Sequence, residues 1–441
     1  MVKGPFMPPP ITEIPPPGTP GFVFSEWMSS MGLRVFTPPF RSDRIEKALD
    51  DPLLFFLTNR LGLTPALSYS KALTRGTWFH TIAALWCNQP PEDTCPPTSN
   101  FSFQTLGLYA SRLEARLQEL RTQCAAMGIH GDRLTEVLAR EEKDHHCARA
   151  WFDVALQVPF HTPKKTLTTL KDLILHKDHK IVGCEIRVSF NVDRCPGTPL
   201  IATFDLLIYN KRTNTLWVVD WKTCECLVTK RLNICPAETQ SQLYLYAARE
   251  AIKSPNFLTS MNLPANVRLG GMIHVVVQKP TIEFGSLDRD FTVDVSPFTR
   301  GPRKGQPRNE KKYHGEPRFP NYLVRCRNWY LAEEDYLHLK DTRKAPPVGI
   351  SWIFPQSLDG EALDRYHDRL EYTHDLCTRS VDPDPRRRFL ANPSTLHTPG
   401  DHDNPYLPFY TCGLLEWPEI IRKGGFIQAP REAIDLEAIA L

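Results

Sequence analysis

The chain has 441 residues, of which 41% are hydrophobic and 23% charged, an ordinary globular composition with room for two or three domains or one elaborated domain. Its formal net charge of only +3 excludes a uniformly basic protein, so any nucleic-acid surface must come from local clusters of Lys and Arg. Twelve cysteines, no secretory signal peptide and no apolar run near the roughly 20 residues of a membrane span predict a cytoplasmic protein with reduced thiols and no membrane partner.

The N-terminal part is expected to be an extended segment followed by helices. Residues 1–40 contain two runs of three prolines and are predicted to be extended. A helical pattern follows a candidate cap at 42–43, and a second helix is predicted over 69–86. Gly76 and His80 lie one turn apart on one face of that helix. A single histidine on an apolar helix is most often a core or rim residue, so this spacing alone does not make His80 a ligand.

A helical insertion is predicted at about 88–178, beginning with a Pro-rich loop at 88–100. A strand with frequent β-branched residues follows at 181–192 and carries the carboxylate of Glu185. This strand leads directly into the stretch of chain with the clearest chemical pattern.

Residues 200–223 (LIATFDLLIYNKRTNTLWVVDWKT) predict a β-hairpin. The arms 200–209 and 215–223 are rich in β-branched and aromatic residues. Between them, 210–214 is polar and flanked by Asn, as expected for a short hairpin loop. The sequence therefore predicts two antiparallel neighbours in a sheet.

The register of this hairpin brings two acids together. If Tyr209 pairs with Leu216, continuing the pairing places Asp205 opposite Asp220, with their Cβ atoms roughly 5 Å apart. Side chains alternate along a strand, so Lys222 shares the face of Asp220. Two carboxylates at that distance repel each other and have no reason of stability to sit in mid-strand.

A divalent cation resolves this repulsion, because Mg²⁺ and Mn²⁺ prefer oxygen ligands and keep several waters. The Lys222 amine can then orient a water and balance charge that develops on a phosphate, while Trp221 points to the opposite face. The alternative is a surface hairpin with a charged outer face, but the continuous apolar run before Asp220 argues against it.

The rest of the chain predicts further elements around the hairpin. A helix over 237–253 carries Gln242 and Tyr246 one turn apart on one face, and a strand follows at 270–280. The basic, Gly- and Pro-broken run 300–318 is predicted to be a loop, either a phosphate contact or a solvated linker. Two later helices are predicted at 322–339 and 360–377.

Taken in order, these residues resemble the RecB-like branch of the PD-(D/E)XK nuclease superfamily, over roughly 42–86 and 180–282. The elements that carry the resemblance are a Gly-x-x-x-His helix, a Glu-bearing strand, an Asp, an Asp-x-Lys-Thr, a Gln-x-x-x-Tyr helix and a strand that ends in Lys-Pro: Gly76, His80, Glu185, Asp205, Asp220, Lys222, Gln242, Tyr246, Lys279 and Pro280. One Asp-x-Lys is weak evidence, whereas the whole series in this order is specific.

The resemblance implies a role for each of these positions. His80, Asp205 and Asp220, with the carbonyl of Trp221, are expected to bind the metal ion. Lys222 is expected to activate or orient a water. Glu185, Gln242 and Tyr246 are expected to line the site and position DNA.

Some relatives, including AddB-like enzymes and CRISPR-adaptation nucleases, hold a [4Fe–4S] cluster between an early Cys-Pro and three late cysteines. Here the early position resembles Asp51-Pro52, and the late segment 403–412 keeps only its last cysteine, Cys412. A cluster needs four thiolates or close substitutes, so no iron–sulfur cluster is expected. The two ends are instead expected to be joined by packing of apolar side chains, for which the candidates are Phe55, Phe56, Tyr406 and Phe409. A zinc site at Cys224, Cys226 and Cys235 is disfavoured, because no paired Cys-x-x-Cys exists.

The fold class expected from the resemblance is α/β, a PD-(D/E)XK core with a central mixed sheet flanked by helices. The expected organisation is a Pro-rich segment at 1–40, a nuclease domain at 41–290, a basic loop and helix at 291–345 and a loop-rich C-terminal extension at 346–441 that packs on the nuclease domain.

The expected activity is hydrolysis of DNA phosphodiesters with Mg²⁺ or Mn²⁺, in recombination, repair or phage DNA processing in a bacterial or phage-infected cell. Exonuclease is favoured, and a helicase or recombination protein is a candidate partner. The alternatives are an endonuclease and a non-catalytic DNA-binding or assembly subunit. Retention of both aspartates, Lys222 and His80 argues for activity, because a catalytically dead copy need not keep them together.

Overall fold

The computed structural model describes the chain in fifteen ranges. They are 28–29, 33–34, 52–65, 71–88, 101–162, 166–191, 199–297, 299–300, 302–304, 306–308, 310–331, 347–354, 416–423, 426–428 and 439–440. The helix predicted at 360–377 lies outside these ranges.

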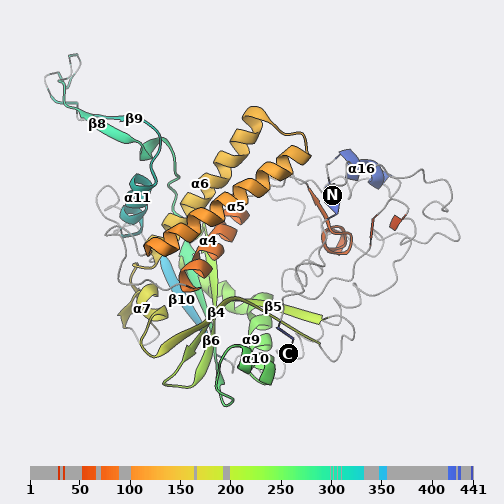
Figure 1. Ribbon diagram of the computed structural model, residues 1–441. Helices are drawn as coiled ribbons and strands as arrows, with labels where there is room; N and C mark the ends of the chain where they lie inside the picture. The colour runs from red at the N-terminus through yellow and green to blue at the C-terminus, as the bar shows by residue number, and fades with distance from the viewer. Residues whose placement is uncertain are drawn as a thin grey trace.

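A six-stranded mixed sheet forms the centre of the molecule (Figure 1). Its strands, in spatial order, are β10 (Val348–Ile353), β7 (Arg268–Gln278), β6 (Thr215–Cys224), β5 (Pro199–Asn210), β4 (His179–Asn191) and β12 (Ile439–Ala440). The pairs β6–β7 and β4–β12 are parallel, and the other neighbours are antiparallel. The apolar run in β6 reflects its central place, because a strand covered on both faces needs no polar alternation.

Helices cover both faces of this sheet, so the predicted α/β class is confirmed. The longer helices are α4 (Lys71–Asn88), α5 (Phe103–Ala126), α6 (Gly131–Ala155), α9 (Thr239–Ala251) and α11 (Phe319–Leu331). The shorter ones are α3 (Pro52–Phe55) with a π-helical turn at Phe56–Arg60, α7 (Leu170–Ile174), α8 (Val228–Ile234), α10 (Pro255–Ser260), α16 (Trp417–Lys423) and two 3₁₀ turns at Cys235–Ala237 and Ser286–Asp288. None of the helices in the described ranges is long and apolar enough to cross a membrane.

Two buried clusters show which helices lie on which face. Trp221 of β6 packs edge-on against Phe79 of α4 and Phe152 of α6, at ring-centroid distances of 6.4 and 5.7 Å. On the other face, Val218 of β6 belongs to the cluster that includes Leu243 and its neighbours on α9. Alternation along β6 therefore sends Trp221 and its neighbours Asp220 and Lys222 to opposite sides of the sheet.

Polar contacts between α4 and α6 fix the position of α4, the helix that carries His80. The buried guanidinium of Arg75 binds Asp144 at 2.6 Å, and the indole Nε1 of Trp78 donates to Glu141 at 2.8 Å. Charge-assisted bonds of this kind are short and directional when both partners are buried. These contacts fix the rotation of α4 about its own axis. That rotation sets the direction in which the His80 side chain points.

Contacts between distant segments join the two ends of the described chain. Strands β1 (Leu63–Pro65) and β11 (Phe426–Gln428) pair antiparallel, and the Gln428 side-chain amide donates to the Leu61 carbonyl at 2.8 Å. The ring of Phe56 lies 6.5 Å from that of Trp417. Phe55 and Phe56 are buried, whereas Tyr406 and Phe409 lie outside the described residues.

Two further hairpins form small sheets of their own. Strand β2 (Phe160–His161) pairs with β3 (Leu167–Thr168), and β8 (Asp290–Asp294) pairs with β9 (Glu310–His314). The sequence predicted a loop over 300–318, and β9 corrects this prediction. Every residue of β9 is exposed, so its sequence EKKYH has none of the alternation that marks a half-buried strand.

Candidate active site

The β5–β6 hairpin has the predicted register. Tyr209 pairs with Leu216, and the ladder runs inward as far as Leu206 and Val219. It stops one step before Asp205 and Asp220. Beyond that point Oδ2 of Asp205 accepts the backbone N–H of Trp221 at 2.8 Å. The side chain of Asp205 thus replaces a backbone acceptor at the level where the two acids face each other.

The β4–β5 ladder is irregular at the same level. Cys184 pairs with Leu206 and Ile186 with Phe204, and Glu185 lies between them opposite Asp205. Glu185 has φ 54°, the left-handed region that residues other than Gly and Asn rarely adopt. Such a conformation costs of the order of 1 kcal/mol and tends to occur at functional sites. Here the residue with this conformation is the one whose carboxylate lies beside Asp205.

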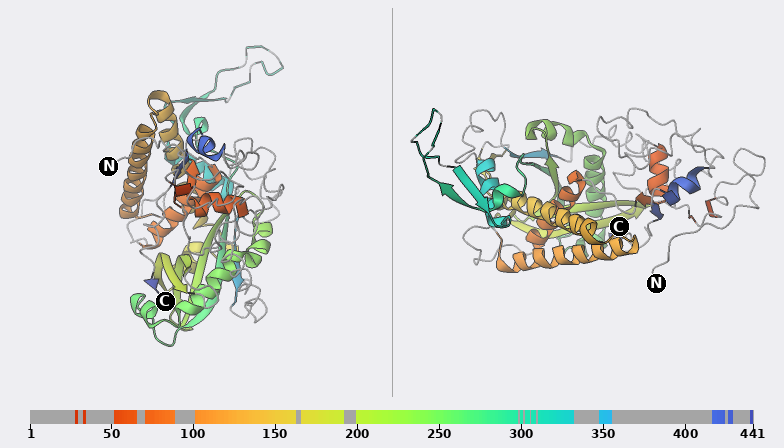
Figure 2. Two further views of the ribbon diagram at one scale, coloured as in Figure 1. Left: turned by 90° about the vertical axis from the view of Figure 1, so that its right-hand side faces the viewer. Right: turned by 90° about the horizontal axis from the view of Figure 1, so that it is seen from above.

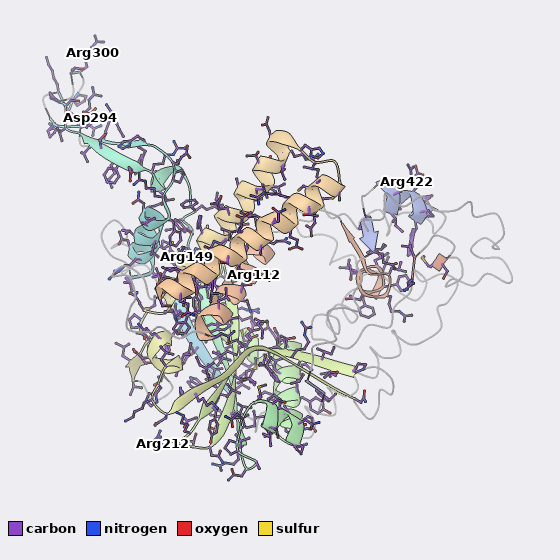
Figure 3. The ribbon with its side chains drawn as sticks, in the orientation of Figure 1. Arg112, Arg149, Arg212, Asp294, Arg300 and Arg422 are labelled. Atoms are coloured by element: carbon purple, nitrogen blue, oxygen red, sulfur yellow. The ribbon has the colours of Figure 1, made fainter. Side chains whose placement is uncertain are left out.

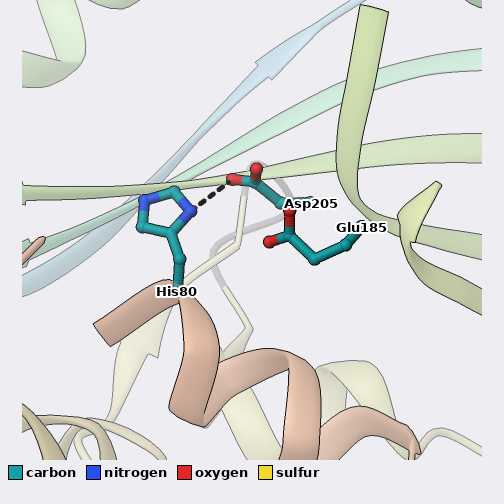
Figure 4. A group of neighbouring side chains, drawn as sticks. All are labelled: His80, Glu185 and Asp205. Carbon is teal, nitrogen blue, oxygen red and sulfur yellow. Dashed lines mark ion pairs between the residues drawn. The ribbon is translucent and has the colours of Figure 1, made fainter. Parts of the chain in front are cut away.

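His80 approaches these acids from α4 (Figure 4). Its Nδ1 lies 3.2 Å from Oδ2 of Asp205, and ligand atoms of His80, Glu185 and Asp205 all lie within 4.8 Å of one another. Burial alone lowers the pKa of His80, but the charge and hydrogen bond of Asp205, with Asp220 and Glu185, outweigh it and raise the pKa to about 9. Without a metal ion, a protonated His80 therefore partly neutralises the acids. Within the described ranges, these three side chains, called here the candidate metal group, are the one set of three or more that could hold a metal ion.

Asp220 is not one of these three residues, but it is close enough for its charge to act on His80, and it is fully buried. Its Oδ2 contacts Nζ of Lys222 at 3.2 Å and Nδ1 of His274 at 2.8 Å. Burial acts to raise the pKa of Asp220, but Lys222 and His274 lower it more, so the carboxylate is ionised. Oδ1 has no hydrogen-bond partner among the described residues. A buried carboxylate oxygen without a partner is costly, and a bound cation would satisfy it.

Lys222 is held between the sheet and α9. Its ammonium donates to Oε1 of Gln240, and the Gln240 amide donates to the hydroxyl of Tyr244 at 2.8 Å. Burial and the charges of Asp205 and Asp220 raise the pKa of Tyr244 well above its usual range, which places this phenol near the acids. The Lys222 amine is thereby fixed next to Asp220.

These residues come from α4, three adjacent strands and α9, in the order predicted from the sequence. The profile of the PD-(D/E)XK nuclease superfamily matches residues 42–265, just over half of the chain and the whole span from His80 to Tyr244. The chain belongs to the PD-(D/E)XK nuclease superfamily. No curated protein matches it. The RecB-like branch within this PD-(D/E)XK superfamily stays a prediction.

The glutamine and tyrosine that the PD-(D/E)XK site brings to Lys222 differ from the predicted pair. The sequence QSQLYLY at 240–246 contains the spacing twice, as Gln240 with Tyr244 and as Gln242 with Tyr246. Positions two residues apart on an α-helix differ by about 200° around its axis. The two pairs therefore point to opposite sides of α9. The Tyr246 ring packs on Phe190 at 5.5 Å. Gln240 and Tyr244 are therefore the pair linked to Lys222, while the role expected of Gln242 and Tyr246, lining the site and positioning DNA, stays a prediction.

Gln240→Ala is expected to lower cleavage about tenfold or more, because it removes a half-buried partner that orients the Lys222 amine. Gln242→Ala is the matched control, since it makes the same change on the same helix two residues away. Single-turnover rates of the two purified variants decide between them. A larger loss in Gln242→Ala would restore the pair predicted from the sequence.

His274 is a further residue of the PD-(D/E)XK site that the sequence analysis missed. It lies on β7, in register with Asp220, and both ring nitrogens are bonded: Nδ1 to Asp220 and Nε2 to Oγ of Ser241 at 2.9 Å. Ser241 donates its hydroxyl to the Cys235 carbonyl, which can only accept. The Ser241 hydroxyl oxygen is therefore free to accept the hydrogen bond from Nε2, and Nδ1 lies 2.8 Å from Oδ2 of Asp220. The signal in the sequence was a lone His within the apolar strand GGMIHVVVQ.

His274 is thus expected to hold the Asp220 carboxylate so that Oδ1 stays free for a cation. Asn places an amide N–H near the position of Nδ1, whereas Gln places one near Nε2. We expect His274→Gln to lower Mn²⁺ affinity or turnover about 10–100-fold and His274→Asn to lose less. Calorimetric Mn²⁺ titration and single-turnover rates test this, with circular dichroism as the check on folding. Equal losses in both variants would indicate a purely structural role.

The remaining site predictions stay open. The Trp221 side chain lies in the core and its N–H bonds to Asp205, while ligation by its carbonyl stays a prediction. Asp51 and the segment 403–412, on which the expectation about the iron–sulfur cluster depends, lie outside the described residues. Cys224, Cys226 and Cys235 form no group able to hold a metal within the described ranges.

Proposed function

We propose that the chain is a Mg²⁺- or Mn²⁺-dependent deoxyribonuclease, with exonuclease as the favoured mode. The observation that carries this proposal is the unpartnered, buried Oδ1 of Asp220 beside the candidate metal group and the Lys222 amine. One imidazole with several carboxylates is a donor set that suits Mn²⁺ and Mg²⁺. If Asp220 served only in structural ion pairs, there would be no reason for its buried Oδ1 to lack a hydrogen-bond partner.

Each residue then has a defined task. His80, Glu185, Asp205 and Asp220 would hold the cation, which as a Lewis acid lowers the pKa of a bound water and stabilises charge on the phosphate. His80 gives up its proton to serve as a ligand. Lys222 lies close enough to Asp220 to orient the attacking water and to balance charge on the phosphate. Gln240 and Tyr244 keep the Lys222 amine in place.

The test is digestion of linear duplex DNA, labelled at its ends, and of closed circular DNA of the same sequence, with Mg²⁺, with Mn²⁺ and with EDTA. An exonuclease degrades the linear form from its ends and leaves the circle intact. Cleavage of both forms would replace exonuclease by endonuclease. Binding of DNA without cleavage of either form under any metal condition would identify the non-catalytic alternative and overturn the proposal.

A further inference from the structure

The β8–β9 ribbon projects from the body of the molecule beyond α11 (Figures 1 and 2). Residues 290–314, called here the basic arm, comprise these two strands and the segment between them. The two strands form a sheet of their own, separate from the central one. An isolated two-stranded hairpin is marginally stable in water, so an arm of this kind needs a firm base or a partner.

The base of the basic arm is firmly held. Asp288 is fully buried, and its carboxylate accepts from Arg325 on α11 and from the Gly285 N–H, each at 2.7 Å. Its carbonyl accepts from the Asn321 side chain of α11 at 2.9 Å. Helix α11 is in turn joined to α6, where the Trp151 indole donates to the Tyr322 hydroxyl at 3.2 Å. The arm is thus presented in a defined direction.

The arm concentrates positive charge far beyond that of the chain as a whole. The 25 residues of the arm hold six basic and three acidic side chains, a net charge of +3, which equals that of the entire 441-residue chain, and the 18 residues from Val295 to Lys312 alone carry +5. The basic residues are Arg300, Arg303, Lys304, Arg308, Lys311 and Lys312. All of them are exposed except Arg308, which is half-buried. Figure 3 shows Arg300 at the outer end of the arm.

The two faces of the ribbon differ. Phe291, Val293 and Tyr313 are 46, 48 and 38% exposed on one face, and the Lys311 amine lies 4.6 Å from the Phe291 ring centre. On the other face Lys312 pairs with Asp294 at 2.7 Å. Centres of protein–protein interfaces are depleted of lysine, so a small apolar face with lysine above it fits a protein partner poorly. A narrow ribbon with a basic end fits the major groove of duplex DNA, which is about 12 Å wide and flanked on both sides by phosphates.

We propose that the basic arm is a duplex-DNA-binding element that contacts the phosphate backbone outside the catalytic centre. This inference rests on the proposed function, because it assigns a second contact to the same DNA substrate. The arm supplies no residue to the metal-binding site described above. Its contribution is to binding, so its loss raises KM for long duplexes and leaves kcat unchanged.

The test replaces Arg300, Arg303 and Lys304 together by Gln in the full-length chain. The matched control replaces Lys177, Lys211 and Arg212 by Gln, since these are exposed and Arg212 lies at the opposite end of the molecule in Figure 3. Fluorescence anisotropy in EDTA measures binding to a labelled 30-base-pair duplex and to a single strand of equal length. Binding is followed across a salt series, and melting temperatures check that both variants fold.

We expect the arm variant to bind the duplex at least tenfold more weakly, with the slope of log K against log salt reduced by up to about 3, one phosphate contact per lost charge. The control is expected to stay within twofold of the parent, and single-strand binding of the arm variant within threefold. Unchanged duplex binding, a loss equal to that of the control, or an equal loss on single strands would overturn the proposal.

Hydrolysis of bis(p-nitrophenyl) phosphate with Mn²⁺ separates this inference from the proposed function, because so small a diester cannot reach the arm. The arm variant is expected to hydrolyse it at the parental rate while KM for duplex rises. A parent that cleaves neither substrate would contradict the proposed function itself. A parent that cleaves both, with an arm variant indistinguishable from the control on duplex, would contradict the arm proposal alone.

Discussion

Asp220→Asn is expected to abolish metal-dependent cleavage, lowering kcat by about 10³-fold or more. Asp220 offers the one carboxylate oxygen of the site that is buried and without a partner among the described residues. Several kcal/mol of charge stabilisation depends on the cation held there, and each 1.36 kcal/mol corresponds to a factor of about ten in rate. Mn²⁺ titration by calorimetry and single-turnover cleavage measure the two parts of this effect.

Asn is a better test than Ala at this position, because Asp220 contacts both Lys222 and His274. The Asp220 carboxylate compensates both Lys222 and His274, so Asp220→Ala would remove the partner of the buried His274 Nδ1, leave Lys222 with Gln240 alone and destabilise the fold. Breaking a buried charge pair from one side costs about 3–5 kcal/mol. Asn keeps an acceptor oxygen in place. Asp153→Asn serves as control, since Asp153 is an equally buried acid on α6 outside the site. Cleavage by Asp220→Asn at the level of the control would refute the metal-site assignment.

The residues that the sequence could place are those fixed by local geometry. The register of the hairpin followed from its loop and from strand alternation, which are short-range properties, and this register brings Asp205 and Asp220 to the same level. Lys222 shares a face with Asp220 for the same reason. His80 could be placed on a helix face, but its approach to Asp205 depends on the buried contacts between α4 and α6.

The residues that the sequence could not place depend on rotation or on distant partners. The repeat in QSQLYLY offers two pairs with identical spacing, and only the rotation of α9 against β6 selects Gln240. His274 reaches Asp220 because β7 lies parallel to β6, a pairing between segments about 50 residues apart that no local pattern encodes. The left-handed backbone conformation at Glu185 could not be predicted, because the residue there is not a glycine. Strand β9 is exposed throughout, so its pairing with β8 leaves no hydrophobic signal.

Lys222→Met is expected to leave metal binding intact and to lower turnover about 10²–10³-fold. The three carboxylates and His80 remain, and the loss of a cation 3.2 Å from Asp220 should if anything strengthen Mn²⁺ affinity. The transition state, however, loses a preorganised positive charge and the group that orients the water. Met preserves the length and apolar packing of the Lys stem, so the change isolates the ammonium.

Two measurements on Lys222→Met, Mn²⁺ affinity by calorimetry and single-turnover rate at saturating Mn²⁺, separate binding from chemistry. Lys230→Met on α8 is the control, because Lys230 is exposed and contributes nothing to the site described above. Weaker Mn²⁺ binding with a normal rate at saturation would make Lys222 a support for the metal site rather than a participant in the reaction. A normal rate and normal affinity together would remove Lys222 from the mechanism and leave its contacts with Gln240 and Asp220 as structural ones.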